Sequence, residues 1–182
     1  MDEIQSAYIP WHEGSHLITK NPGESPAFRR VIGLMAEYFD IDLTKPHATR
    51  FNWYKSLNDW KPMHHDSAGF NRERAKSQNI TIGVTFGAKR ELTFLHAKNH
   101  TTVNFPQENN MMFSFGSSVN IRFMHGIVAL TEQQKKEFES GRISIILWGW
   151  SNLVDRQPGD PDMIPERKTD RNRHRDFNRI QR

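Results

Sequence analysis

The sequence of 182 residues contains no cysteine. This absence excludes disulfide bonds, thiolate zinc sites and cysteine nucleophiles, and it fits a reducing compartment. No stretch approaches the roughly 20 apolar residues that a membrane-spanning helix requires, so no membrane partner is expected. The first ten residues include Asp2 and Glu3 and lack the apolar core of a secretory signal. We therefore expect a soluble intracellular protein, cytoplasmic or nuclear and not secreted.

The positive charge is concentrated at the C-terminal end. Residues 166–182 carry seven Lys or Arg against three Asp or Glu, which equals the formal net charge of +4 for the whole chain. Such a tail binds phosphates electrostatically, with a strength that depends on the salt concentration and not on the base sequence. Nucleic acid is one partner that this tail predicts, and a solvated end that only aids solubility is the alternative.

The distribution of turn-forming residues divides the chain into three segments. Residues 1–24 are predicted to be irregular, because prolines and glycines interrupt them. Residues 25–154 have a length that supports one domain with a single core. Residues 155–182 are rich in Pro, Gly, Asp and Arg and are predicted to be a disordered, basic tail.

The domain is predicted to begin with a helix. Ser25 followed by Pro26 is typical of a helix start, with a capping hydroxyl and a proline in the first turn. Apolar residues then recur at helical spacing as far as residue 39, namely Phe28, Val31, Ile32, Met35 and Phe39. One face of this helix should therefore pack on the core.

The spacing of apolar residues becomes alternating after Pro46, which is typical of strands. Residues 79–86 (NITIGVTF) alternate strictly, and further strands are predicted at 49–55, 63–66, 91–95, 101–105, 111–115, 120–124 and 142–150. Residues 131–134 (TEQQ) form a capping-box pattern that predicts a short helix ending near Gly141. About eight strands with frequent turns predict a mainly β protein with flanking helices: a double-stranded β-helix (jelly-roll) core with an N-terminal helix.

One short motif suggests metal chemistry. His64 and Asp66 lie two residues apart, so in extended backbone they face the same side while His65 faces the other. His125 is expected to supply a third ligand from a neighbouring strand. Two His and one carboxylate on one face of an ion suit non-haem Fe(II), which needs vacant positions for a co-substrate and dioxygen. Arg142 is then a candidate to hold a carboxylate of that co-substrate.

Five features occur in order between roughly residues 50 and 150. They are N-x-Y at Asn52–Tyr54, H-x-D at His64–Asp66, a strand-turn-strand over 80–94, H-G-I at His125–Ile127 and R-x-S at Arg142–Ser144. Together they resemble the AlkB-like branch of the 2-oxoglutarate- and Fe(II)-dependent dioxygenases. The resemblance implies an oxidoreductase that uses Fe(II), 2-oxoglutarate and O2 to hydroxylate or oxidatively demethylate a substrate.

The resemblance also implies a role for each matched residue. His64, Asp66 and His125 would be the catalytic metal ligands, and they bind a metal only with neutral imidazoles and an ionised carboxylate. Arg142 would pair with 2-oxoglutarate, because a guanidinium fork matches a carboxylate with two parallel bonds. Asn52, Tyr54 and Ser144 would add hydrogen bonds to the same co-substrate.

The sequence departs from that branch in three respects. One is that 63 residues precede His64, which is expected to leave little room for the N-terminal lid that grips a nucleotide in this branch. Trp148 stands where the branch usually has a second Arg, six positions after the first. Small residues at 67–69 follow Asp66, where nucleic-acid demethylases of this branch often carry acidic side chains. The oxygenase core is therefore better supported than an alkylated-base substrate.

A nucleobase in DNA or RNA is nevertheless the leading substrate class. The candidates to stack on a base and to hold phosphate are Trp53, Trp60, Phe70, Arg72 and Arg74, and residues 70–79 are a candidate substrate lid. The alternative is that the aromatic residues pack in the core and that the charges are solvated.

Several alternatives remain open at the level of function and assembly. The same oxygenase chemistry on a protein side chain or a small metabolite is the first rival, and a non-catalytic binding module on a jelly-roll scaffold is the second. The pairs His12/His16 and His96/His100 are interpreted as solvated loop histidines. A monomer or a weak dimer is expected, since an edge strand of a jelly roll can pair with a second copy.

Overall fold

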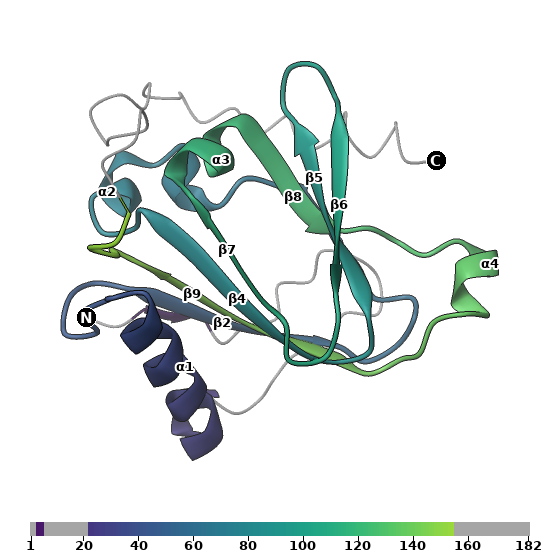
Figure 1. The fold of residues 1–182 in the computed structure, drawn as a ribbon, viewed down its shortest axis with the longest axis horizontal. Helices are drawn as coiled ribbons and strands as arrows, with labels where there is room; N and C mark the ends of the chain where they lie inside the picture. Colours follow the sequence, from purple (N-terminus) through teal and green to yellow (C-terminus); the bar gives the residue numbers. More distant parts are fainter. Residues whose placement is uncertain (1–2, 6–21, 155–182) are drawn as a thin grey trace.

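The computed structural model describes residues 3–5 and 22–154, and these form two β-sheets with short flanking helices (Figure 1). The strands are β1 (Glu3–Gln5), β2 (Ala48–Tyr54), β3 (Lys61–His64), β4 (Ile80–Gly87), β5 (Arg90–His96), β6 (Thr102–Gln107), β7 (Met112–Gly116), β8 (Phe123–Ile127) and β9 (Arg142–Gly149). The α-helices are α1 (Pro26–Tyr38), α2 (Arg72–Ala75), α3 (Ser117–Arg122) and α4 (Glu132–Lys135), and two 3-10 helices are η1 (Pro22–Glu24) and η2 (Ser67–Gly69).

The order of the strands is that of a jelly roll. One sheet has the order β1-β2-β9-β4-β7 and the other the order β3-β8-β5-β6. Neighbouring strands are antiparallel except β1 and β2. Successive strands alternate between the two sheets from β2 to β5 and again from β6 to β9. This winding confirms the predicted fold class, a mainly β double-stranded β-helix core with an N-terminal helix.

Helix α1 covers the outer face of the five-stranded sheet. The Ser25 hydroxyl accepts a hydrogen bond from the Phe28 N–H at 3.3 Å, and Pro26 is the first helical residue, so the predicted start is confirmed. The helix contributes Phe28, Ile32, Met35 and Ala36 to one buried cluster with Ile80, Ile82, Ile145 and Leu147 of β4 and β9. The opposite face of β4 and β9 is thereby left for the space between the sheets.

Strand β4 shows why the two faces differ in character. Its alternation places Ile80 and Ile82 in the α1 cluster, and Thr81 and Gly83 on the inner face. A Cβ at Gly83 would lie 2.2 Å from a ring atom of Phe113, so glycine leaves room for the Phe113 ring here. The strand is thus apolar on its outer face and small or polar on its inner face.

The prediction of a strand at 120–124 is wrong for the first half of that range. The structure has helix α3 over Ser117–Arg122, and β8 begins only at Phe123. The cause is tertiary. The buried Asn120 side chain bonds to the backbone of Asp66, and the Ser117 hydroxyl donates to the Asn79 carbonyl at 3.1 Å. Such side-chain-to-backbone bonds compete with a strand ladder.

The helix after Thr131 is shorter than predicted. Thr131 and Gln134 form the expected capping box, but α4 ends at Lys135 instead of near Gly141. No residue of α4 is buried, and a short exposed helix has no packing that would extend it. Gly141 instead adopts a φ of +86° immediately before β9.

Parts of the flanking segments lie outside the described residues. Residues 1–24 are predicted to be irregular, and within them β1 pairs with the start of β2 while η1 precedes α1. His12, His16 and the basic segment 155–182 are not among the described residues. In the part that the structure describes, no helix is long and apolar enough to cross a membrane.

Candidate metal centre

His64, Asp66 and His125 meet between the sheets. His64 on β3 is directly opposite His125 on β8, with ring centroids 4.5 Å apart. The Asp66 oxygen Oδ1 lies 3.8 Å from His64 Nε2 and 3.6 Å from His125 Nε2. These distances are less than twice a metal–ligand bond of about 2.1 Å, so the three side chains are spaced to share one ion.

The backbone at Asp66 preserves the geometry that the sequence predicts, although the strand does not extend that far. A strand is predicted at 63–66, whereas β3 spans Lys61–His64 and Asp66 follows it. Asp66 remains extended, with φ −64° and ψ 149°, immediately before η2. His64 and Asp66 therefore face one side, and the His65 imidazole lies instead at the backbone carbonyl of Asn120.

The His64 ring is oriented by a backbone carbonyl. Its Nδ1 lies 2.8 Å from the Pro62 oxygen, which can only accept, so Nδ1 carries the proton and Nε2 presents a lone pair to the centre. Burial, followed by the nearby Lys61 and His125 side chains, holds the pKa of His64 well below its ordinary value. His64 is consequently neutral at pH 7, as a metal ligand must be.

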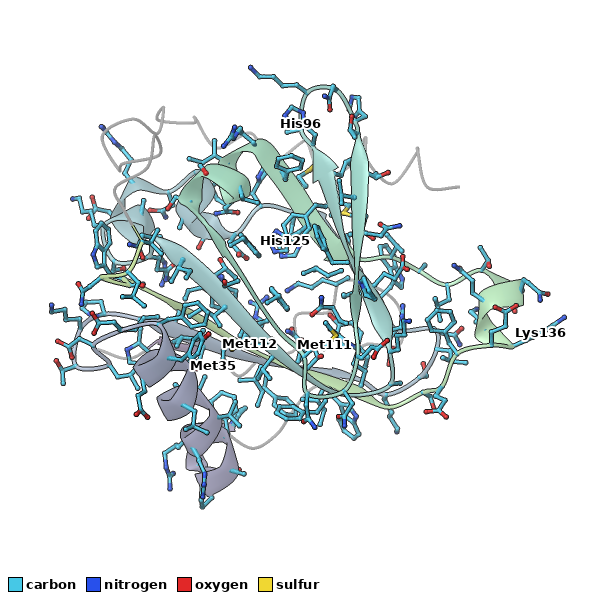
Figure 2. All side chains as sticks on the ribbon, in the orientation of Figure 1. Met35, His96, Met111, Met112, His125 and Lys136 are labelled. Atoms are coloured by element: carbon cyan, nitrogen blue, oxygen red, sulfur yellow. The ribbon has the colours of Figure 1, made fainter. Side chains whose placement is uncertain are left out.

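The His125 ring is positioned by aromatic packing. Phe115 meets it edge to face at a centroid distance of 4.8 Å, and Phe94 lies tilted at 5.8 Å. Figure 2 shows the His125 side chain directed from β8 toward the interior between the sheets. Within the described residues, no hydrogen-bond partner is found for His125 Nδ1. Ring contacts therefore orient this imidazole, whereas a hydrogen bond orients His64.

The Asp66 carboxylate is buried and ionised. Burial opposes ionisation, but the His125 and His64 imidazoles beside it hold the pKa of Asp66 well below its usual range. The Thr81 hydroxyl donates to the second oxygen, Oδ2, at 2.8 Å, which leaves Oδ1 facing the two imidazoles. Thr81 was not predicted as a site residue. Its signal in the sequence is its place among the small or polar residues that alternate with apolar ones over 79–86.

Asn120 holds the chain on both sides of Asp66. Its Oδ1 accepts from the Asp66 N–H at 2.8 Å, and its Nδ2 donates to the Asp66 carbonyl at 3.2 Å. The backbone carbonyl of Asn120 also accepts from His65 Nδ1. The Asn120 side chain is buried, so these bonds form in a dry environment. Sequence reasoning missed this residue, because nothing local distinguishes it from other asparagines.

Gly126 makes room for a bulge in β3. Lys61 pairs with Ile127 and His64 pairs with His125, so three steps on β3 match two on β8. A Cβ at Gly126 would lie 2.6 Å from the Lys61 oxygen and 2.9 Å from the Pro62 oxygen. Only glycine fits beneath this bulge, and the bulge presents the Pro62 carbonyl that orients His64. The presence of glycine in the H-G-I motif thus has a steric explanation.

The candidate metal ligands line a cavity between the sheets. The five-stranded sheet contributes Asn52, Tyr54, Thr81, Arg142, Ser144, Ile146 and Trp148, and the four-stranded sheet contributes Lys61, Leu92, Gly126 and Ile127. All four residues predicted to bind the co-substrate are therefore brought to the same cavity as the candidate metal centre.

These four residues form two cross-strand pairs of β2 and β9. Asn52 is opposite Ser144 and donates from Nδ2 to its hydroxyl at 3.0 Å, while Tyr54 is opposite Arg142. The Arg142 guanidinium carbon lies 4.9 Å from the centroid of the Tyr54 ring. The alternation of two paired strands therefore places all four side chains on one wall of the cavity.

Arg142 is a buried cation with spare hydrogen-bond donors. It is 2% exposed, and in the described part of the chain its Nε and Nη1 have no hydrogen-bond partner. Burial lowers the pKa of Arg142, yet a guanidinium stays protonated in proteins. A buried, unsatisfied cation is costly unless an anion joins it. This wall of the cavity therefore fits a carboxylate.

Trp148 occupies the position where the resemblance places a second Arg. Its side chain is buried and lines the cavity. The guanidinium of Arg50 lies 5.7 Å from the centroid of the indole ring, but Arg50 does not line the cavity. The chain thus replaces a cation with an aromatic ring at this point of the lining.

The predicted substrate residues on the strands do not line the cavity. Trp53 alternates with Asn52 and Tyr54 on β2, so it faces the other side of the sheet, where it is 40% exposed. Trp60 immediately precedes β3 and is half-buried. The structure therefore does not bring either tryptophan to the metal ligands.

The other three predicted substrate residues lie on the segment that follows Asp66. Phe70 is 43% exposed after η2, and Arg72 and Arg74 belong to α2, which the Asn71 side chain caps. None of the three lines the cavity. They follow the centre closely in the sequence, and each is at least partly exposed.

His96 lies at the end of β5, away from the centre, as Figure 2 shows. Its Nδ1 lies 3.3 Å and 3.2 Å from the backbone nitrogens of Lys98 and Asn99 in the turn before β6. This histidine therefore supports a turn.

Comparisons with known proteins add little to these observations. No protein-family model matches the sequence, and no curated protein matches it. The chain is similar to a solved structure described as OsALKBH1, with a TM-score of 0.43 and 12% identity, over 76% of this chain and 68% of that one. It is also similar to an RmlC-like cupin protein from Desulfovibrio desulfuricans, with a TM-score of 0.31 and 11% identity, over 55% and 71%. Both likenesses are too distant to support a function.

The fold and the site define a class by themselves. The chain is a double-stranded β-helix protein with a two-histidine, one-carboxylate candidate metal centre between its sheets.

Proposed function

We propose that this chain is a 2-oxoglutarate- and Fe(II)-dependent dioxygenase. The observation that carries the proposal is the coexistence, in one cavity, of three convergent metal-ligating side chains and a buried arginine with spare donors. The first group fits a metal ion and the second fits a carboxylate. A metal-chelating dicarboxylate meets both requirements at once.

The donor set fits Fe(II) in particular. Two imidazoles and one carboxylate on one side of an ion leave positions open for a co-substrate and dioxygen. When bound, Fe(II) supplies the activation of dioxygen, coupled to decarboxylation of 2-oxoglutarate to succinate, that oxidises a substrate C–H bond. His64, Asp66 and His125 would hold the ion, with Thr81 and Asn120 keeping the carboxylate in place.

The cavity wall formed by β2 and β9 binds and orients the co-substrate. The Arg142 guanidinium, with its unpaired donors, would hold one carboxylate of the co-substrate, and the buried surroundings would strengthen that pairing. The Asn52 amide and the Ser144 hydroxyl, already bonded to each other, offer further polar contacts beside it. Tyr54 fixes the guanidinium by stacking.

The rest of the lining keeps water away. Leu92, Phe113 and Ile127 contribute apolar surface to the cavity, and Phe94 and Phe115 pack behind His125. A dry site strengthens the electrostatic contacts within it and limits side reactions of activated oxygen.

A nucleobase in DNA or RNA is the substrate that we propose. Support comes from the exposed Phe70 and the partly exposed Arg72 and Arg74, which follow the candidate ligand Asp66 in the sequence, and from the basic composition of residues 166–182. Cations hold phosphates and an aromatic ring stacks on a base. Oxidation of an N-methyl group would release formaldehyde and leave the demethylated base.

The first experiment measures succinate formed from 2-oxoglutarate. Full-length protein is loaded anaerobically with Fe(II) and exposed to oxygen, with and without methylated and unmodified oligonucleotides. Stimulation by an oligonucleotide is the expected result. Slow turnover that no oligonucleotide stimulates would retain the oxygenase and move the substrate to a protein side chain or a small metabolite. No succinate under any condition would contradict the proposal.

Variants at Asp66 and Arg142 separate metal binding from co-substrate binding. Asp66→Ala should abolish turnover together with high-affinity metal binding. Arg142→Met should weaken 2-oxoglutarate binding by about 10- to 100-fold with metal affinity retained, because one charged hydrogen-bonded contact is lost. The 2-oxoglutarate affinity of Arg142→Lys should lie between those of the wild type and Arg142→Met, since lysine keeps the charge but lacks the two-pronged guanidinium. Lys98→Met, at an exposed position in the β5–β6 turn, is the matched control.

A further inference from the structure

Lys61 is a buried lysine whose side chain lines the cavity. It is the first residue of β3 and is 9% exposed. In the part of the chain that the structure describes, its ammonium group has neither a hydrogen bond nor an ion pair. Lysine is rarely this buried without a partner. A lysine that lines the cavity and has no partner among the described residues points to a ligand.

The β3 bulge aims Lys61 into the cavity. Residues three apart on a regular strand face opposite sides, so Lys61 would point away from the side that His64 faces. The extra residue between them removes one step of the alternation, and both side chains line the same cavity. Gly126 permits that bulge, because a Cβ there would meet the Lys61 carbonyl at 2.6 Å.

The charges of the residues that line the cavity favour the binding of an anion. Lys61 and Arg142 are its lining cations, and Asp66 is the only carboxylate among the lining residues. Burial, together with the charges of Arg50 and Arg142 and against the opposing effect of Asp66, lowers the pKa of Lys61 to about 7. Asp66 is already shared between two imidazoles and Thr81. A bound anion would therefore stabilise the protonated ammonium of Lys61.

We propose that Lys61 binds the same dicarboxylate as Arg142, at its carboxylate nearer the metal ligands. The two cations come from different sheets, Lys61 from β3 and Arg142 from β9, so they clamp the ligand from two sides. Lys61 is three residues from His64 on the same strand and both side chains line the cavity, which is why we assign it to the carboxylate nearer the metal ligands. This inference rests on the proposed function, because it takes 2-oxoglutarate as the ligand.

The test is 2-oxoglutarate binding to the full chain loaded anaerobically with Mn(II), measured by calorimetry without turnover. Lys61→Met should weaken binding by about 10- to 100-fold, the range of a charged hydrogen-bonded contact. Lys61→Arg should retain most of the affinity, and Lys98→Met should match the wild type. Lys61→Gln is a second uncharged variant in case the Met variant does not fold.

A second ligand identifies which carboxylate Lys61 contacts. 2-Oxopentanoate has the metal-chelating end of 2-oxoglutarate but lacks the far carboxylate. Lys61→Met should weaken both ligands by a similar factor, whereas Arg142→Met should weaken only 2-oxoglutarate.

The two proposals fail in different ways. If the wild type binds 2-oxoglutarate and the uncharged Lys61 variants bind it with an affinity within twofold of the wild type, the role of Lys61 is overturned. The dioxygenase proposal would then remain intact. Absence of 2-oxoglutarate binding by the Mn(II)-loaded wild type would overturn both.

Discussion

Asn120 connects two parts of the candidate metal centre that are distant in the sequence. Its amide bonds to both backbone groups of Asp66, 54 positions earlier in the chain. Groups of this kind orient a metal ligand without touching the metal, and their loss typically reduces metal affinity by about 10- to 100-fold. At the scale of residues, the centre therefore depends on Asn120 and Thr81 as well as on its three ligands.

Asn120→Ala should reduce Mn(II) affinity by about 10- to 100-fold. It should also lower the free energy of unfolding by about 1–3 kcal/mol, because the buried backbone groups of Asp66 lose their partners. Calorimetry and urea unfolding measure the two effects. Asn99→Ala, in the exposed turn before β6, is the control. Unchanged Mn(II) affinity in a folded Asn120→Ala protein would contradict the positioning role.

Lys61 should make stability depend on pH in the protein without metal. Its pKa is about 7 when folded, against an ordinary value of 10.5. Between these values the unfolded chain binds more protons than the folded one, so the contribution of Lys61 to stability rises from about pH 7 to pH 10. Lys61→Met should be more stable than the wild type near pH 7, because it removes an unpaired buried charge.

Urea unfolding of both proteins at pH 7 and at pH 9.5 measures this contribution. The stability advantage of Lys61→Met should shrink at the higher pH, where the wild-type lysine is neutral. A constant difference between the two proteins across this range would show that the folded pKa of Lys61 is not lowered.

At the scale of elements, the β3–β8 pair depends on one glycine. Gly126→Ala should destabilise the protein by about 1–3 kcal/mol or more, since the added Cβ meets two backbone carbonyls and the bulge must move. Gly33→Ala should instead stabilise it by about 0.5–1 kcal/mol, because Gly33 lies in α1 with open space around it.

Urea unfolding of the two variants checks this contrast. Mn(II) binding should be weakened only by Gly126→Ala, because the bulge also presents the Pro62 carbonyl to His64. If Gly126→Ala were as stable as the wild type and bound Mn(II) equally well, the steric argument for the H-G-I glycine would be wrong.

Elements with a strong local signal were predictable. The α1 start follows from Ser25 and Pro26, and β4 follows from strict alternation over 79–86. The α3 helix was not predictable, because the contacts that stabilise it join residues far apart in the sequence. Asn120 bonds to Asp66, and Ser117 bonds to Asn79. The β3 bulge was missed for the same reason, since register is a property of two paired strands.

At the scale of the whole molecule, the helix side and the cavity side of the five-stranded sheet are separate. Met35→Ala removes a side chain that is 3% exposed in the α1 cluster and should cost about 2–5 kcal/mol of stability. Its Mn(II) affinity below the unfolding transition should match the wild type. Urea unfolding and calorimetry test both parts, and a loss of metal affinity in the folded variant would show that the two faces are coupled.

The sequence by itself determined the fold class, the candidate ligand types and those elements that have a strong local signal. Spacings such as H-x-D and N-x-Y translate directly into side-chain direction once the backbone is extended, because the period of a strand is two. The positions of Asn52, Tyr54, Arg142 and Ser144 on one wall follow from that period and from the pairing of β2 with β9.

Only the tertiary structure decided what surrounds the ligands. It brought Thr81 and Asn120 to Asp66 and left Trp53 on the outer face of its sheet. It also turned Lys61 into the cavity through a bulge that fits over Gly126. These outcomes depend on pairing register and on contacts between residues far apart in the chain, and no local pattern encodes either.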